Sequence, residues 1–378
     1  MGTMDLKKSK RSRSYYMKKT FLFLSVLIVL FFTACSPKVT EVKPNIVFPA
    51  YPDEPKIVYL DTYRGGVSAE DDKGLGGVID VFLGEDNGGA GVSNIIKPYG
   101  VGLQDGKVYA VDTGSDAVFI MDEKTREVEF LGNKARGRLV APVALAFDGN
   151  GTVYVSDAKQ KLIQGYDKKG KLKYVLGGRL VFTYPTGIAI NKKLNRLYVV
   201  DTKQHHFQAF DLKTKEHLFT VGKRGKGDAE FNFPTNLAVD QRNGNVVVVD
   251  TQNFRVQIFD KDGNFIRRFG KIGDKPGMFA RPKGVGIDTE GHIYVSDAAF
   301  NNVQIFDDQG RLLLYFGSAG YTPATFRLIA GLYIDENDKI VIADGFSGRV
   351  QTFQYLSEKW KQAHPEEYKK FKEFQPEM

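Results

Sequence analysis

Six Asp residues in this sequence have a residue type and a regular spacing that could do chemistry. Each ends a run of β-branched and aromatic residues, such as Val153–Asp157, and they recur every 44 to 49 residues: Asp112, Asp157, Asp201, Asp250, Asp297 and Asp344. Carboxylate oxygens are ligands that Ca²⁺ prefers, so a ring of them could hold a cation. An Asp at a strand end also accepts hydrogen bonds from N–H groups of the following turn. We favour this structural role, because a binding site usually breaks the symmetry of a repeated scaffold.

Other residues offer little material for catalysis. The single Cys excludes a disulfide framework and a multi-cysteine metal site. The five His residues are expected in turns, at the start of an outer strand and in the tail, and not at one place: His205, His206, His217, His292 and His364. We therefore predict no catalytic, cofactor-binding or metal-binding residues and no cofactor. A calcium site built from carboxylates and carbonyls remains open as an alternative.

The residues around each recurring Asp predict four short strands per repeat. An apolar strand precedes each run, as in Pro185–Ile190, and two more follow, as in Arg255–Phe259 and Asn264–Gly270. Gly, Asn and Asp residues separate the strands and are typical of tight turns. Four strands repeated at this period predict the blades of a β-propeller.

The ends of the repeat array predict how the ring closes. The sixth repeat ends after its third strand, Arg349–Phe353, while a lone strand at Lys56–Leu60 precedes the first repeat. That strand matches the outermost strands of the other repeats, so it would complete the sixth blade and remove an open sheet edge. We predict an all-β, six-bladed β-propeller over residues 56–356, closed by an N-terminal outer strand.

The repeats resemble those of the NHL family, most clearly in Phe233–Asp240 followed by Val248–Phe259. The resemblance implies an NHL-type six-bladed propeller that serves as a binding platform, in its bacterial cell-envelope lipoprotein version. Relatives by fold include metal-dependent lyases and lactonases with ligands at the mouth of the central channel. The alternative function is therefore a metal-dependent hydrolase or lyase at that mouth.

The N-terminus predicts export. Residues 1–34 form a basic start followed by the apolar run Phe21–Phe32, which is too short to cross a bilayer. Phe32–Cys35 resembles the lipobox of bacterial lipoproteins, in which the Cys is lipidated. We expect a lipoprotein signal peptide over residues 1–34, with translation starting at Met1 or Met17, and an exported protein anchored through Cys35 to a bacterial membrane, the outer membrane in a Gram-negative cell.

Three further segments lie outside the regular repeat. Residues 35–55 contain five Pro and are expected to form an extended tether behind the lipidated Cys. Residues 64–94, rich in Gly and acidic residues, form an insertion. In the tail, residues 357–378, Pro365 followed by Glu366 and Glu367 predicts the start of a short amphipathic helix.

The charge distribution argues against nucleic acid as a partner. The formal charge is +8, but residues 1–34 hold seven basic residues and one acidic residue, which leaves +2 for the remainder. We predict a non-catalytic binding or scaffold lipoprotein of the cell envelope that recognises a protein or polysaccharide partner. The oligomeric state stays open.

Overall fold

The computed structural model describes residues 44–66, 93–133 and 136–373. The predicted signal peptide, Cys35 and most of the 64–94 insertion lie outside these residues. The described chain from Pro44 onward forms one compact unit.

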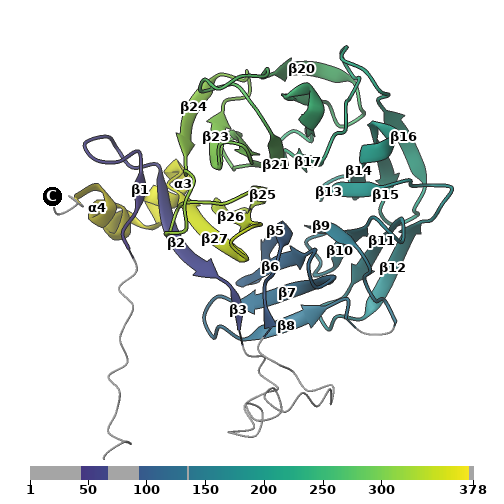
Figure 1. The fold of residues 1–378 in the computed structure, drawn as a ribbon, viewed down its shortest axis with the longest axis horizontal. Helices are drawn as coiled ribbons and strands as arrows, with labels where there is room; N and C mark the ends of the chain where they lie inside the picture. The colour runs from purple at the N-terminus through teal and green to yellow at the C-terminus, as the bar shows by residue number, and fades with distance from the viewer. Residues whose placement is uncertain (1–43, 67–92, 134–135, 374–378) are drawn as a thin grey trace, which may run out of the picture. The chain divides into compact units, whose positions relative to one another are not determined.

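Six antiparallel sheets, five of four strands and one of five, surround a central axis (Figure 1). The innermost strand of each blade is β5 (Pro98–Gln104), β9 (Pro142–Phe147), β13 (Pro185–Asn191), β17 (Asn236–Val239), β21 (Pro282–Ile287) or β25 (Ile329–Ile334). The second strands are β6 (Lys107–Asp112), β10 (Val153–Asp157), β14 (Arg196–Asp201), β18 (Val246–Asp250), β22 (Ile293–Asp297) and β26 (Lys339–Asp344). The predicted six-bladed propeller is confirmed.

The third and outer strands complete each blade. The third strands are β7 (Ala117–Asp122), β11 (Leu162–Tyr166), β15 (His206–Asp211), β19 (Arg255–Phe259), β23 (Asn302–Phe306) and β27 (Arg349–Tyr355). The outer strands are β8 (Val128–Leu131), β12 (Leu172–Gly177), β16 (His217–Val221), β20 (Phe265–Phe269), β24 (Leu312–Phe316) and β2 (Ile57–Tyr63). Strand β2 pairs antiparallel with β27, with Ile57 opposite Tyr355, so the N-terminal strand closes the ring as predicted.

Hydrophobic clusters fill the interfaces between adjacent blades. Over the described residues there are six such clusters, one for each blade-to-blade interface. Phe353 and Phe326, for example, are fully buried between blades five and six. Because strand side chains alternate between the two faces of a sheet, each blade buries both faces against its neighbours.

Glycines near the start of the inner strands allow neighbouring blades to meet at the axis. A Cβ on Gly331 would lie 2.2 Å from the carbonyl oxygen of Tyr99, and a Cβ on Gly187 would lie 2.5 Å from Cα of Asn236. The backbone N–H of Gly187 donates to the carbonyl of Thr235 in the next blade at 3.1 Å. Glycine is required here by close backbone approach.

The segment before β2 differs from the expected tether. β1 (Val47–Phe48) pairs with β2 and adds a fifth strand to blade six. The Phe48 ring lies 5.6 Å from that of Phe316, and Ile46 also packs on this blade. The part of the 35–55 segment that the structure describes therefore docks on the propeller, because its apolar residues bury surface that a solvated tether would expose.

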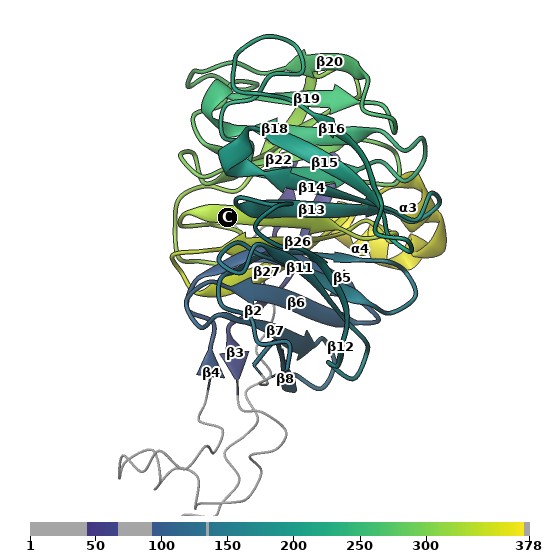
Figure 2. The same ribbon diagram turned by 90° about the vertical axis from the view of Figure 1, so that its right-hand side faces the viewer.

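Two helices follow the propeller, α3 (Glu358–Ala363) and α4 (Pro365–Glu373). The second begins at the predicted Pro365, whereas the first was not predicted. Trp360 packs against Val58 and Leu356 and holds both helices beside β1 and β2 (Figures 1 and 2). Two-residue strands β3 (Gly65–Gly66) and β4 (Ser93–Asn94) pair at the base of the insertion.

Candidate functional site

The six strand-end Asp residues lie at one end of the ring, which we call the Asp face. Each residue is 0% exposed: Asp112, Asp157, Asp201, Asp250, Asp297 and Asp344. Their carboxylates accept backbone N–H groups from the loop that precedes the inner strand of the same blade. Asp201, for example, accepts from Thr183 and Tyr184 at 2.6 and 3.0 Å. The carboxylates thereby tie each loop to the blade that follows it.

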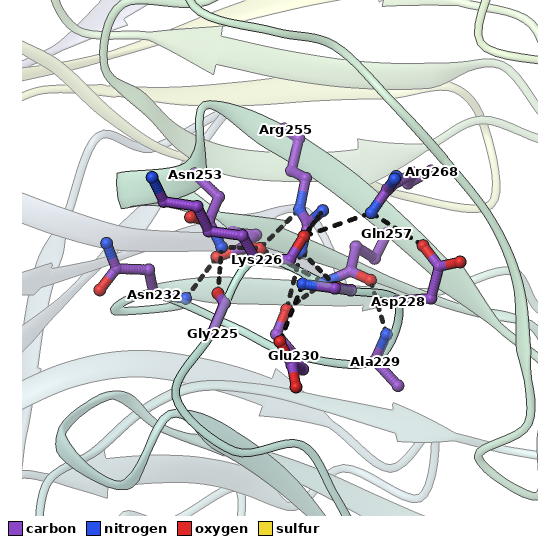
Figure 3. Close-up of polar contacts among 12 residues, drawn as sticks. Gly225, Lys226, Asp228, Ala229, Glu230, Asn232, Asn253, Arg255, Gln257 and Arg268 are labelled. Carbon is purple, nitrogen blue, oxygen red and sulfur yellow. Dashed lines mark hydrogen bonds and ion pairs between the residues drawn. The ribbon is translucent and has the colours of Figure 1, made fainter.

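Asp250 illustrates how completely these oxygens are used, and its donors Asn232, Asn253 and Arg255 are labelled in Figure 3. One oxygen accepts the N–H of Asn232 at 2.7 Å. The other accepts Nδ2 of Asn253 and Nε of Arg255, each at 2.8 Å. Burial raises the pKa of Asp250, and these hydrogen bonds act in the opposite direction. The donors that fill the carboxylate come from the protein itself, which supports a structural role.

Arg255 links this carboxylate to the loop that precedes blade four. Its Nη1 donates to the carbonyl of Lys226, and its Nη2 donates to those of Gly227 and Glu230, all at 2.8 Å. In blade six, Arg349 donates to Asp344 at 2.8 Å in the same manner. The sequence shows Arg at this position in these two repeats only, but it did not predict what the guanidinium groups hold.

No group of three or more His, Cys, Asp or Glu residues is arranged to hold a metal ion within the described residues. The five His residues do not converge: His205 contacts Phe233, His292 binds Asp288, and His364 stacks on Trp360. None of the helices over residues 44–66, 93–133 and 136–373 is long and apolar enough to cross a membrane.

A cavity of about 380 Å³ occupies the central channel. All six inner strands line it, and most of the lining side chains are aliphatic, such as Val101, Ile188 and Leu237. The cavity reaches the end of the ring opposite the Asp face, where turns join the inner strands to the second strands. We call this end the turn face. Charged residues from its turns form the rim of the cavity: Lys192, Lys193, Asp240, Arg242, Asp288, Asp335 and Glu336.

A groove of about 830 Å³ adjoins the channel on the turn face. Its walls are the turns of blades six, one and two on one side, and Trp360, His364 and Phe371 of the C-terminal helices on the other. The channel and the groove share five lining residues: Phe147, Lys192, Tyr333, Asp335 and Glu336. The two hollows therefore form a continuous concave site.

Hydrogen bonds fix the C-terminal helices at the edge of this groove. Ser357, the N-cap of α3, donates its hydroxyl to Asp338 at 2.6 Å and accepts the N–H of Trp360 at 3.2 Å. The N–H of Glu358 and the hydroxyl of Tyr355 both donate to Glu290 of blade five. The tail is thus part of the site. Sequence reasoning could not establish this, because the hydrogen-bonded residues come from three separate segments of the chain: Glu290, Asp338 and residues 355–358.

Comparisons with known proteins agree with this architecture. A family model described as "SMP-30/Gluconolactonase/LRE-like region" matches residues 85–272. A comparison with curated protein sequences found no match. Among solved structures, a structural genomics protein of unknown function from Bacteroides thetaiotaomicron is 18% identical, with a TM-score of 0.57 over 70% of each chain.

Two other similar solved structures have names that state a function. An auxiliary nutrient binding protein from Bacteroides thetaiotaomicron is 14% identical, with a TM-score of 0.54 over 70% of each chain. A streptogramin B lyase is 11% identical, with a TM-score of 0.52 over 68% of this chain and 93% of the lyase. At such identities the similarity shows the fold alone.

The fold and the repeat define a six-bladed β-propeller protein. More particularly, residues 85–272 are similar to the SMP-30/gluconolactonase/LRE-like region, and an NHL-type repeat is consistent with that similarity.

Proposed function

We propose that this protein is a non-catalytic binding protein that captures a protein or polysaccharide partner at its turn face. The observation that carries this proposal is the continuous hollow formed by the channel and the groove. Ligand sites are typically concave, mostly apolar and marked by a few charged groups, as the channel is, and the groove beside it adds polar and charged residues. The similarity to a nutrient binding protein is in keeping with capture.

The proposed location is the bacterial cell envelope, with the chain anchored through a lipid on Cys35. The support is the lipobox-like Phe32–Cys35 after a basic, apolar leader. Metabolic labelling with an alkyne fatty acid should mark the native protein and leave the Cys35→Ser variant unlabelled. Equal labelling of both would contradict the anchor.

Site-specific photo-crosslinking in the source cells tests the binding face. A photoreactive residue replaces Lys193, which is exposed on the rim of the channel, or Lys159, which is exposed in a turn of the Asp face. We expect an adduct with a protein or a polysaccharide from position 193 and none from position 159. An adduct from position 159 alone, or from neither position, would refute binding at the turn face.

The alternative, a metal-dependent hydrolase or lyase at the channel mouth, is favoured by the description of the matching family model, which includes gluconolactonase. Metal analysis of the full chain purified without chelators separates the two proposals. A stoichiometric metal ion that survives dialysis would favour the enzyme. A folded, metal-free protein that still captures its partner would favour the binding protein.

A further inference from the structure

Asp335, on the rim shared by the channel and the groove, breaks the pattern of the repeat. An acidic or amide residue occupies the equivalent position at the end of the inner strand in all six blades: Gln104, Asp148, Asn191, Asp240, Asp288 and Asp335. Where this residue is Asp, its first carboxylate oxygen, Oδ1, accepts hydrogen bonds from backbone N–H groups of the turn that follows. Oδ1 of Asp335 does so from Asn337 at 2.9 Å and from Lys339 at 2.8 Å.

The second carboxylate oxygen has a side-chain donor in the other three blades that carry Asp. Tyr294 and His292 donate to Asp288 at 3.0 and 2.8 Å. Nη2 of Arg242 donates a hydrogen bond to Asp240 at 2.7 Å, and the hydroxyl of Tyr154 donates one to Asp148 at 3.5 Å. Oδ2 of Asp335 has no such partner within the described residues. The reason is local: the second strand of blade six carries Val341 where blades two and five carry Tyr154 and Tyr294, and valine cannot donate.

The cations near Asp335 are already engaged. Nζ of Lys339 donates to both carboxylate oxygens of Glu123, at 2.9 and 3.0 Å. Nζ of Lys192 lies 3.6 Å from Oε2 of Glu336. Lys193 is the rim cation without a partner in the described structure, but its side chain is exposed and solvated, whereas Asp335 is partly buried. Removing a charge from water without a counter-charge is costly, so the partly buried group has the greater need of a partner.

Tyr333 lies beside this carboxylate and breaks a second pattern. The position two residues before that of Asp335 is Gly or Ala in the other five blades: Gly102, Ala146, Ala189, Ala238 and Gly286. In blade six it is Tyr333, whose ring lies 5.7 Å from that of Phe147 and lines both hollows. Its hydroxyl has no hydrogen bond within the described residues. Burial, together with Asp335 and Glu336, raises the pKa of Tyr333, so the hydroxyl remains a neutral donor and acceptor.

We propose that the channel mouth binds a group whose apolar end enters the channel and whose positively charged nitrogen pairs with Oδ2 of Asp335. This inference rests on the proposed binding function and specifies its chemistry: an amine carried on an aliphatic or aromatic body. The aliphatic channel wall receives the body, the free carboxylate oxygen receives the ammonium group, and the Tyr333 hydroxyl is a second polar contact.

Three probes that differ only in their polar group test this inference on the full wild-type chain. Ligand-detected NMR measures the affinities of n-hexylammonium, n-hexanol and n-hexanoate at neutral pH. We expect n-hexylammonium to bind about 10-fold more tightly than n-hexanol, and n-hexanoate to bind most weakly. Equal affinity for the amine and the alcohol, preference for n-hexanoate, or no binding of n-hexylammonium would overturn the inference.

A matched pair of variants locates the effect. Asp335→Asn keeps an acceptor for the turn N–H groups but removes the charge, and we expect it to abolish the preference for n-hexylammonium over n-hexanol. Asp148→Asn removes the same charge from the equivalent position of blade two. Asp148 itself lines neither hollow, so this variant should leave the preference intact. Equal losses in both variants would contradict pairing at Asp335. Because the first comparison uses wild-type protein, it stands even if a variant fails to fold.

The inference and the proposed function fail in different ways. A crosslink from position 193 together with no preference for the amine would retain the binding face and reject the amine chemistry. No crosslink from position 193 would reject the proposed binding function itself.

Discussion

Arg255 donates its Nε to Oδ2 of Asp250 at 2.8 Å, and this ion pair is buried within blade four. The pair also joins strand β19 to the preceding loop through the carbonyls of Lys226 and Glu230. The guanidinium is thus a structural connector within one repeat.

Replacing Arg255 by Ala should strongly destabilise the protein. The change leaves Asp250 buried without its ionic partner and removes one donor from each of three backbone carbonyls, so we expect a loss of about 3–5 kcal/mol in the free energy of unfolding. Arg311→Ala is the matched control, because Arg311 also donates Nε to an Asp, Asp307, but its side chain is 78% exposed. We expect a loss of about 0–1 kcal/mol for that control. Denaturant unfolding measures both, and similar losses would contradict the role assigned to Arg255.

Gly331→Ala should disturb ring closure. The added Cβ would lie 2.2 Å from the carbonyl oxygen of Tyr99 in the first blade, which is too close for any real contact. We expect a loss of about 1–3 kcal/mol in the free energy of unfolding. At Gly66 the nearest atom to an added Cβ, on Val128, is 3.6 Å away, so Gly66→Ala should change stability little. A harmless Gly331→Ala would show that the blades can move apart at this point.

Docking of the C-terminal helices should depend on pH through Glu54. Hydrogen bonds from Tyr368, Lys361 and Lys56 lower the pKa of Glu54 from 4.5 to about 2. A lowered pKa in the folded state gives stability that is present above pH 4.5 and is lost as the pH falls towards 2. Trp360, the only Trp in the chain, stacks on Phe371 of α4 and reports this contact. Its fluorescence should change over this range in wild type, and Glu54→Gln should remove that component of the change.

His292 should stabilise the turn face more at acidic than at basic pH. The hydrogen bond to Asp288 raises the pKa of His292 above 6.5. Its contribution is therefore fully present below 6.5 and is lost as the pH rises through the folded-state value. The stability difference between wild type and His292→Gln should shrink between about pH 6 and pH 8 in denaturant unfolding. A difference that stays constant or grows over this range would contradict the assignment.

The amino-acid sequence by itself determined the architecture of this protein. Runs such as Val153–Asp157 are rich in β-branched and aromatic residues and end in Asp, and that local pattern, repeated six times, predicts blades. The lone strand before the first repeat also predicted ring closure, because a propeller leaves no outer position empty. These are local properties of the chain, so they can be inferred without its three-dimensional structure.

Sequence reasoning did not find the candidate site. It weighed the recurring Asp residues, yet these use their oxygens on backbone N–H groups at the Asp face. Of the two residues that distinguish the turn face, Tyr333 differs in type from its counterparts in the other repeats, and aligning the inner strands position by position could have revealed it. Asp335 has the same residue type as Asp148, Asp240 and Asp288, so the sequence gives no signal for it.

Only the tertiary structure decided which carboxylate lacks a donor and which hollows join. Whether Oδ2 of Asp335 is satisfied depends on Val341 in the next strand, on Lys339 being held by Glu123 of blade one, and on how the tail packs. The docking of Phe48 on Phe316 likewise joins residues far apart in the chain. Such relationships arise from the distances between blades, which the pattern within a single repeat does not contain.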